Sequence, residues 1–240
     1  MRDRFDFVLA MCPTLESSTL LKQHIPESCV FDRYMQTKVD ALVKLASEVA
    51  AAGKERNFLL ILDDVMYDKA ICRTQSFRYL FYNGRHCRIS VVLLQQYLVD
   101  MPPDMRSQVD YVFTMKENTI ANRIKLWRFF FGVFATFEDF CAVLERCTQN
   151  YETLMLDNTA QTNGPADCVF WYKAALECGP FQLGSKAVFT LEERYRRSVP
   201  LPSCMESNDE AAKAGQKGKA KLTVSKEETE PSGDDGVDIR

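Results

Sequence analysis

The chain has 240 residues, of which 46% are hydrophobic and 26% are charged, and its formal net charge at pH 7 is −3. This length allows one α/β domain with a buried core plus a tail, and it excludes two full-sized domains. The nearly neutral charge excludes binding of nucleic acid through an overall basic surface, so any contact with DNA would depend on a local patch.

The last part of the chain differs in composition from the rest. Residues 201–240 have almost no large apolar side chains and carry 9 acidic and 6 basic groups, which leaves 24 of each for residues 1–200. Such a segment cannot bury enough surface to offset the entropy lost on ordering. We therefore predict a core domain over residues 1–200 and a disordered polar tail over residues 201–240.

The nine cysteines do not form the pattern of a zinc site or a disulfide framework. None of them makes a C-x-x-C pair, their number is odd, and only two histidines are present as further ligands. Most lie in apolar segments, where a free thiol packs as a small hydrophobic side chain.

No run approaches the roughly 20 apolar residues that span a bilayer. We expect a soluble intracellular protein in a reducing compartment, with no membrane contact.

The first half of the chain alternates apolar runs with helical patterns. The run from Phe5 to Met11 predicts a buried strand, and the spacing of apolar residues from Tyr34 to Ala52 predicts a helix that ends at Gly53. Phe58 to Leu62 is apolar at every position, which is typical of a central parallel strand. A helix over Arg73–Tyr82 and a second apolar strand over Ile89–Leu94 follow.

The second half continues the alternation. Strands are predicted at 110–114, 151–156 and 168–172, and helices at 117–131 and 136–148. Strands that alternate with helices predict an α/β fold in which a mainly parallel sheet has helices on both faces. In such sheets ligands bind beyond the carboxyl ends of the strands.

Polar side chains stand at two of these strand ends. Asp63 and Asp64 follow the central strand, and Gln95 and Gln96 follow the next one. A hydrophobic strand that ends in two acids has the form of a Walker B element, in which the first carboxylate holds Mg²⁺ and the second accepts a proton from the attacking water. The alternative is a strand that ends in a solvated Asp-Asp turn, since such strings are common.

Further motifs follow the acids in a fixed order. They are Asn83-Gly-Arg-His86, the strand that ends in Gln96, Met101-Pro-Pro-Asp-Met-Arg106, Asp110-Tyr-Val-Phe113, Asn150-Tyr-Glu-Thr-Leu-Met-Leu-Asp157 and Val169-Phe-Trp-Tyr-Lys173. In this order the sequence resembles the DNA-packaging ATPases of nucleocytoplasmic large DNA viruses, a branch of the HerA/FtsK class of P-loop ATPases. The resemblance covers roughly residues 5–190 and implies a RecA-like (P-loop NTPase) fold.

The resemblance implies a role for each matching residue. Asp63 is then the Mg²⁺ ligand, Asp64 the catalytic acid/base, and Gln96 the sensor of the γ-phosphate, with Gln95 as the alternative if the register shifts by one residue. Arg85 and Arg106 are the two candidates for an arginine that acts in the next subunit of a ring, where such a residue is worth about 10³–10⁵ in rate.

The same resemblance implies cofactors, partners and a location. It implies ATP and Mg²⁺ as cofactors, double-stranded DNA as the partner, and a homo-oligomeric ring. The location implied is the virion or viral factory for a viral protein, and the nucleus or cytoplasm for a host-encoded one.

Two departures from the family pattern matter. The 240 residues contain no G-x-x-x-x-G-K-[ST] loop, whose backbone N–H groups and lysine hold the phosphates. In the family that loop precedes the strand that Phe5–Met11 resembles, so the fold is expected to lack its first strand and P-loop, and the isolated chain to bind ATP weakly or not at all. The family-like Arg-Ser-Asn triplet is also Arg106-Ser107-Gln108 here.

Two basic clusters are candidates for DNA contact. One extends from Lys69 to Arg88 without an acidic residue, and the other places Arg123, Lys125 and Arg128 around Trp127. Either could contact phosphates in a ring pore. The alternative for both is a solvated helix face.

Three functions remain open from the sequence. The first is an ATP-driven translocase of double-stranded DNA, incomplete without its phosphate-binding loop. The second is a decayed, virus-derived paralogue that acts only as a non-catalytic interaction or scaffold protein. The third is an unrelated cysteine or dinucleotide enzyme, which the absence of G-x-G-x-x-G and the adjacency of His86 and Cys87 disfavour.

Overall fold

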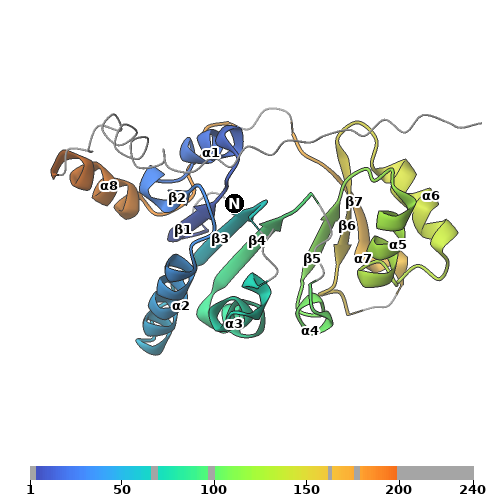
Figure 1. Ribbon diagram of the computed structural model, residues 1–240, viewed down its shortest axis with the longest axis horizontal. Helices are drawn as coiled ribbons and strands as arrows, with labels where there is room; N and C mark the ends of the chain where they lie inside the picture. Colours follow the sequence, from blue (N-terminus) through green and yellow to red (C-terminus); the bar gives the residue numbers. More distant parts are fainter. Residues whose placement is uncertain (1–3, 66–69, 97–100, 162–163, 176–178, 199–240) are drawn as a thin grey trace, which may run out of the picture. The chain divides into compact units, whose positions relative to one another are not determined.

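Four parallel strands form the first sheet of the computed structural model, which describes residues 4–65, 70–96, 101–161, 164–175 and 179–198 (Figure 1). The strand order is β2-β1-β3-β4. Their bounds are β1 Phe7–Met11, β2 Val30–Phe31, β3 Phe58–Asp63 and β4 Ile89–Leu94. The apolar residues of β3 are all buried, as expected for a strand covered on both faces.

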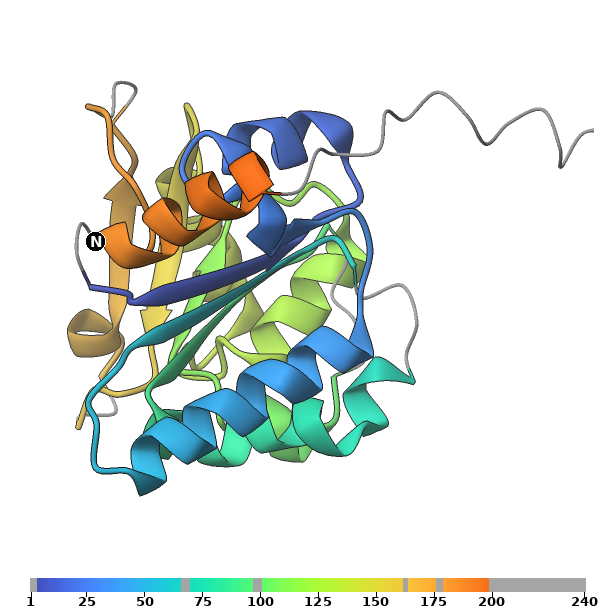
Figure 2. The ribbon, with the colours of Figure 1, turned by 90° about the vertical axis from the view of Figure 1, so that its left-hand side faces the viewer.

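Helices cover both faces of this parallel sheet (Figure 2). On one face lie α2 (Gln36–Ala51) and α3 (Gln75–Asn83), whose apolar sides pack on Leu60 and Leu62 of β3. On the other face lie α1 (Leu15–Lys22), the short η1 helix (Glu27–Cys29) and α8 (Lys186–Ser198), near the cluster that contains Leu59 and Ile61. The predicted class, a parallel α/β sheet with helices on both faces, is confirmed.

The last three strands form a separate antiparallel sheet in the order β5-β6-β7. They are β5 Tyr111–Thr114, β6 Glu152–Asp157 and β7 Val169–Lys173. The prediction of a mainly parallel sheet therefore holds for the first four strands and not for these three. The connection from β6 to β7 (158–168) is shorter than the dozen or more residues of a parallel crossover, which favours the antiparallel pairing of these two strands. Connection length does not explain β5 and β6, which are antiparallel although α5 and α6 lie between them.

One face of the antiparallel sheet is covered by α5 (Ile120–Phe129) and α6 (Phe137–Cys147). Their core includes Phe131, Phe140 and Leu144, with Leu154 and Leu156 from β6. The α6 helix begins at a capping residue, because Thr136 Oγ1 accepts a hydrogen bond of 3.1 Å from the backbone N–H of Asp139. Two one-turn helices, α4 (Pro103–Arg106) and α7 (Pro165–Cys168), precede β5 and β7.

The predicted helices and strands occur at the expected places, with shifted ends. The α2 helix ends at Ala51, and Gly53 follows it in the left-handed backbone conformation, with φ of +67°, as the sequence predicts for a glycine after a helix. The helix expected at 73–82 is divided into η2 (Ile71–Arg73) and α3, because the backbone of Thr74 is extended between them. A further short helix, η3 (Gly84–Cys87), leads into β4.

Other expectations concern cysteines, membranes and the tail. The described residues contain seven cysteines, all free thiols, and no cluster of three or more His, Cys, Asp or Glu side chains that could hold a metal ion. Among the helices of the described residues, none is long and apolar enough to cross a bilayer. The polar tail predicted at 201–240 lies outside the described residues.

Candidate functional site

The carboxyl ends of β1, β3 and β4 bring several polar groups to one edge of the parallel sheet. Asp63 is the last residue of β3 and pairs in register with Leu94, the last residue of β4. On the other side of β3, Met11 of β1 pairs with Leu62, so Cys12 follows next to Asp63. The alternation of side chains along β3 applies to Asp63, whereas Asp64 lies just beyond the end of the strand.

Cys12 is a neighbour of Asp63 that the sequence analysis did not single out. Its buried thiol donates a hydrogen bond of 3.0 Å to Asp63 Oδ2. Burial raises the pKa of Cys12, and the hydrogen bond to the Asp63 carboxylate raises it further. The thiol therefore stays protonated and holds one oxygen of Asp63. The position of Cys12 directly after an apolar strand was the available signal.

Asp64 and Gln96 meet beyond the end of the sheet. Asp64 has a left-handed backbone, with φ of 55°, and its N–H donates to the Leu94 carbonyl at 3.0 Å. This turn directs the carboxylate toward the loop after β4, where Gln96 Nε2 donates to Asp64 Oδ2 at 2.6 Å. The structure thus brings together the acids and the glutamine that the sequence analysis placed at one edge, while their catalytic roles remain a prediction.

Gln95 differs from Gln96 in its surroundings. The Nε2 atom of Gln95 is buried and has no hydrogen-bond partner among the described residues. Gln96 is the more exposed residue and is the one that contacts Asp64. Of the two glutamines, Gln96 is therefore the one placed against Asp64.

The two candidate arginines have different environments. Arg106 donates from Nη1 to the Met101 carbonyl at 2.8 Å, and its guanidinium stacks 4.0 Å from the centroid of the Phe129 ring. Arg85 is in η3, before β4, and its more exposed side chain forms an ion pair with Asp110. Within the described part of the chain, neither arginine contacts Asp63 or Asp64. The contacts of Arg106 are those of a structural residue, whereas Arg85 is the one free to leave a surface ion pair.

The basic clusters are largely occupied by ion pairs. In the first, Arg78 pairs with Asp104 at 2.8 Å, and Arg88 pairs with Glu55 at 2.6 Å. Lys69 lies outside the described residues. In the second cluster, Arg123 is held by Glu145 at 2.6 Å.

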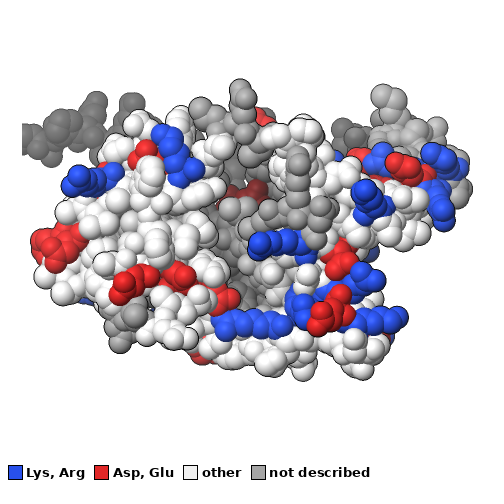
Figure 3. Space-filling model, turned by 180° about the vertical axis from the view of Figure 1, so that it is seen from behind, with Lys and Arg blue, Asp and Glu red and all other residues white. Residues whose placement is uncertain are grey.

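The remaining members of the second cluster differ in their surroundings. Trp127 donates its indole N–H to the Phe134 carbonyl at 3.1 Å, while Lys125 and Arg128 stay exposed. Figure 3 shows acidic and basic side chains interspersed over the described part of the face it presents. The structure therefore offers DNA no single basic patch on that face.

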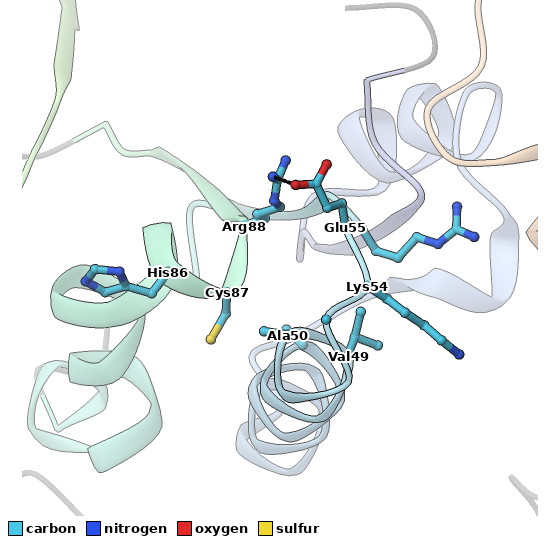
Figure 4. A pocket seen from close by; sticks show the side chains of 10 residues that line it. Val49, Ala50, Lys54, Glu55, His86, Cys87 and Arg88 are labelled. Atoms are coloured by element: carbon cyan, nitrogen blue, oxygen red, sulfur yellow. Dashed lines mark hydrogen bonds and ion pairs between the residues drawn. The ribbon is translucent and has the colours of Figure 1, made fainter.

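A pocket of about 210 Å³ lies at the opposite end of the parallel sheet from the acids. Its lining comes from the end of α2, the loop before β3, and η3. Figure 4 shows the ion pair between Arg88 and Glu55 at this pocket, with Lys54 directed away from it. The six residues of β3 span roughly 20 Å, so this pocket is separate from the strand ends that carry Asp63 and Asp64.

The edge with the acids suits Mg²⁺ with a phosphate ligand. Mg²⁺ prefers oxygen ligands and is usually held by one or two carboxylates together with waters and substrate phosphates. Asp63 can present its second oxygen to such an ion, because Cys12 holds the first. Asp64 and Gln96 then provide a carboxylate and an amide on the same side.

Comparison with known proteins confirms the resemblance inferred from the motifs. Residues 24–131 match the family model described as Poxvirus A32 protein. Uncharacterized protein 015R of Frog virus 3 (isolate Goorha) is 34% identical over 164 residues, which is 66% of this chain and 50% of that protein. Uncharacterized protein 088R of Invertebrate iridescent virus 3 is 30% identical over 168 residues, 70% of this chain and 64% of that protein.

A solved structure gives a similar but weaker likeness. The genome packaging NTPase B204 of Sulfolobus turreted icosahedral virus 2, in complex with AMPPCP, is 16% identical with a TM-score of 0.48. The match covers 72% of this chain and 84% of that one. The curated relatives are longer, and the chain spans about half to two thirds of their length.

Proposed function

We propose that this chain forms the metal-binding and water-activating part of an ATPase that drives double-stranded DNA into viral capsids. The observation that carries the proposal is the meeting of Asp63, Asp64 and Gln96 at the carboxyl edge of neighbouring parallel strands, with Gln96 Nε2 at 2.6 Å from Asp64 Oδ2. The match to the Poxvirus A32 protein family over residues 24–131 supports the same function.

Each residue has a distinct task in this proposal. Asp63 would hold Mg²⁺, and that ion would supply charge neutralisation at the phosphates of ATP. Asp64 would accept the proton of the attacking water. The amide of Gln96 donates to that carboxylate and would contact the γ-phosphate or the water with ATP bound. Cys12 stabilises the orientation of Asp63 by donating to Oδ2.

The proposal includes a ring of subunits and a phosphate-binding segment. Since the 240 residues contain no G-x-x-x-x-G-K-[ST] loop, the phosphates of ATP require backbone N–H groups and a lysine from another segment. Arg85 is the better candidate to act in a neighbouring subunit, because Arg106 is engaged by Met101 and Phe129. DNA translocation would take place in the virion or viral factory.

The test compares ATP hydrolysis by the chain alone with that by a chimera. In the chimera, a strand and a G-x-x-x-x-G-K-T loop are placed before Phe5. We expect background turnover for the chain alone and Mg²⁺-dependent turnover for the chimera. The Asp64→Asn variant of the chimera should lose turnover by about 10²–10⁴, as expected for loss of a general base. Robust turnover by the chain alone, or full turnover in Asp64→Asn, would contradict the proposal.

The second candidate function is non-catalytic. The observation that favours it is that the 240 residues contain no G-x-x-x-x-G-K-[ST] loop, so these residues by themselves offer a fold for assembly with partners and no phosphate ligands of that kind. The same experiment separates the two functions. A folded chimera that binds ATP and does not hydrolyse it supports the interaction protein.

A further inference from the structure

Each of the two acids at the carboxyl edge of the parallel sheet has one oxygen bonded to a neighbouring side chain. Cys12 Sγ donates to Asp63 Oδ2 at 3.0 Å, and Gln96 Nε2 donates to Asp64 Oδ2 at 2.6 Å. Within the residues that the structure describes, neither carboxylate has a further side-chain hydrogen bond or ion pair. One oxygen of each acid is therefore left for a cation.

The two donors differ in how firmly they are held. Cys12 is fully buried, and its backbone N–H donates to the Phe31 carbonyl at 2.8 Å, so the residue is fixed between β1 and β2. The register of β1 with β3 places its thiol beside Asp63. Gln96 is exposed and lies beyond the end of β4. The contact of Cys12 with Asp63 is therefore the more permanent of the two.

The thiol proton of Cys12 has two acceptors within reach. Asp63 Oδ2 lies 3.0 Å from the sulfur, and the Thr14 carbonyl oxygen lies 3.5 Å from it. A thiol is ordinarily a weak donor, but a hydrogen bond to an ionised acceptor is stronger than one to a neutral acceptor. The carboxylate is both closer and charged, so the proton is directed at Asp63.

Mg²⁺ and Ca²⁺ make different demands on a carboxylate. Ca²⁺ takes roughly 6–8 oxygen ligands in a flexible arrangement and often uses both oxygens of one carboxylate. Mg²⁺ demands a near-octahedral shell, keeps several waters and is held by one or two carboxylates. A carboxylate with one oxygen already bonded to a thiol can serve Mg²⁺, but it cannot offer both oxygens to Ca²⁺.

We propose that Cys12 is a positioning residue that makes this edge of the sheet selective for Mg²⁺ over Ca²⁺, because its thiol reserves one oxygen of Asp63. The inference rests on the proposed function, which assigns Asp63 as the metal ligand, and adds the feature that selects the ion. Cys12 acts through Asp63 and does not itself bind the ion. Loss of the thiol frees Asp63 Oδ2, so both oxygens of this carboxylate can turn toward the larger ion.

The other cysteines of the described residues lack this arrangement. Cys168 Sγ donates to a backbone carbonyl, that of Gly164, at 3.2 Å. Cys72 lies in η2, is 4% exposed and has no hydrogen bond to a carboxylate among the described residues. Cys72 is therefore a matched control for the loss of a buried thiol that does not contact an acid.

The experiment titrates the full chain with each ion in the absence of ATP. The backbone amide signals of Asp63 and Asp64 are followed by NMR as Mg²⁺ or Ca²⁺ is added, which gives the ratio of the two dissociation constants. The unmodified chain should bind Mg²⁺ more tightly than Ca²⁺. Cys12→Ala should shift this ratio toward Ca²⁺ by about tenfold, the lower end of the usual effect of losing a side chain that orients a metal ligand.

Three further variants separate positioning from packing. Cys12→Ser keeps a hydroxyl donor and should keep the ratio of the unmodified chain. Cys72→Ala should also keep that ratio, even where the free energy of unfolding falls. If Cys12→Ala does not fold, Cys12→Val fills the same space without a donor and should give the same shift toward Ca²⁺.

The outcomes also separate this inference from the proposed function. A preference of the unmodified chain for Ca²⁺, a ratio that the loss of the thiol does not change, or an equal shift in Cys12→Ser would overturn the role of Cys12 and leave the proposed function standing. Absence of any change at Asp63 and Asp64 with both ions would overturn the metal site and the selectivity together.

Discussion

The two sheets of this protein differ in how their faces are covered. The parallel sheet has apolar clusters on both faces of β1 and β3, with helices outside them. The antiparallel sheet is covered by α5 and α6 on one face only, and Phe113 on its other face is 58% exposed. The parallel sheet carries the acids at its edge, whereas the antiparallel sheet leaves Phe113 exposed on one face.

The largest effect should come from the buried sheet. Leu60→Ala in β3 removes a side chain that is fully buried, and we expect a loss of about 2–5 kcal/mol in the free energy of unfolding. Phe113→Thr, on the bare face of β5, should change the same quantity by less than about 0.5 kcal/mol. Urea denaturation followed by circular dichroism measures both. Equal losses would mean that the face of β5 is covered in solution.

The arginines that flank the two sheets allow a second comparison. Arg106→Ala should lower the free energy of unfolding by about 1–3 kcal/mol, because it removes a charged hydrogen bond to the Met101 carbonyl and the stacking on Phe129. Arg85→Ala removes an exposed ion pair and should cost less than about 1 kcal/mol.

These two variants should also separate in activity. In mixed rings of the chimera, Arg85→Ala should reduce ATP turnover although the protein stays folded. A stable Arg106→Ala protein, or an active Arg85→Ala ring, would reverse the assignment.

A smaller effect is expected in the pH dependence of stability. Burial raises the pKa of Tyr34, which packs against the core of the parallel sheet, from 10.0 to about 12. The neutral phenol is therefore favoured in the folded state, and its contribution is complete below pH 10 and is lost as the pH rises toward 12. Tyr34→Phe should flatten the decline of unfolding free energy between pH 10 and 12. An unchanged slope would show that Tyr34 ionises as easily in the folded protein.

Much of the parallel sheet could be predicted from the sequence. The uniform apolarity of Phe58–Leu62 identified a strand covered on both faces, and the acids and glutamines after two such strands indicated a common edge. The contact of Cys12 with Asp63 could not be predicted, because it depends on the register between β1 and β3. Register is normally specified by the alternation of apolar and polar residues, and β1 and β3 are apolar at nearly every position, so their sequences do not specify it.

The antiparallel sheet was harder to predict for a physical reason. Apolar runs such as Thr153–Leu156 are compatible with either strand direction, so the run itself does not specify how the strand pairs. The structural role of Arg106 also depends on a residue distant in sequence, Phe129, which the motif Met101–Arg106 does not contain. Local patterns therefore identified the residue types of the site and not which of them are held by tertiary contacts.

The most direct test of the central claim compares two acids that each end a strand. Asp63 ends β3 at the proposed site, whereas Asp157 ends β6 and accepts hydrogen bonds from Thr159 N–H at 2.8 Å and Thr159 Oγ1 at 2.6 Å. The measurement is the Mg²⁺ concentration that gives half-maximal ATP turnover by the chimera. Asp63→Asn should raise it at least about tenfold or abolish turnover, and Asp157→Asn should leave it unchanged. Equal Mg²⁺ dependence in the two variants would contradict the assignment of Asp63 as the metal ligand.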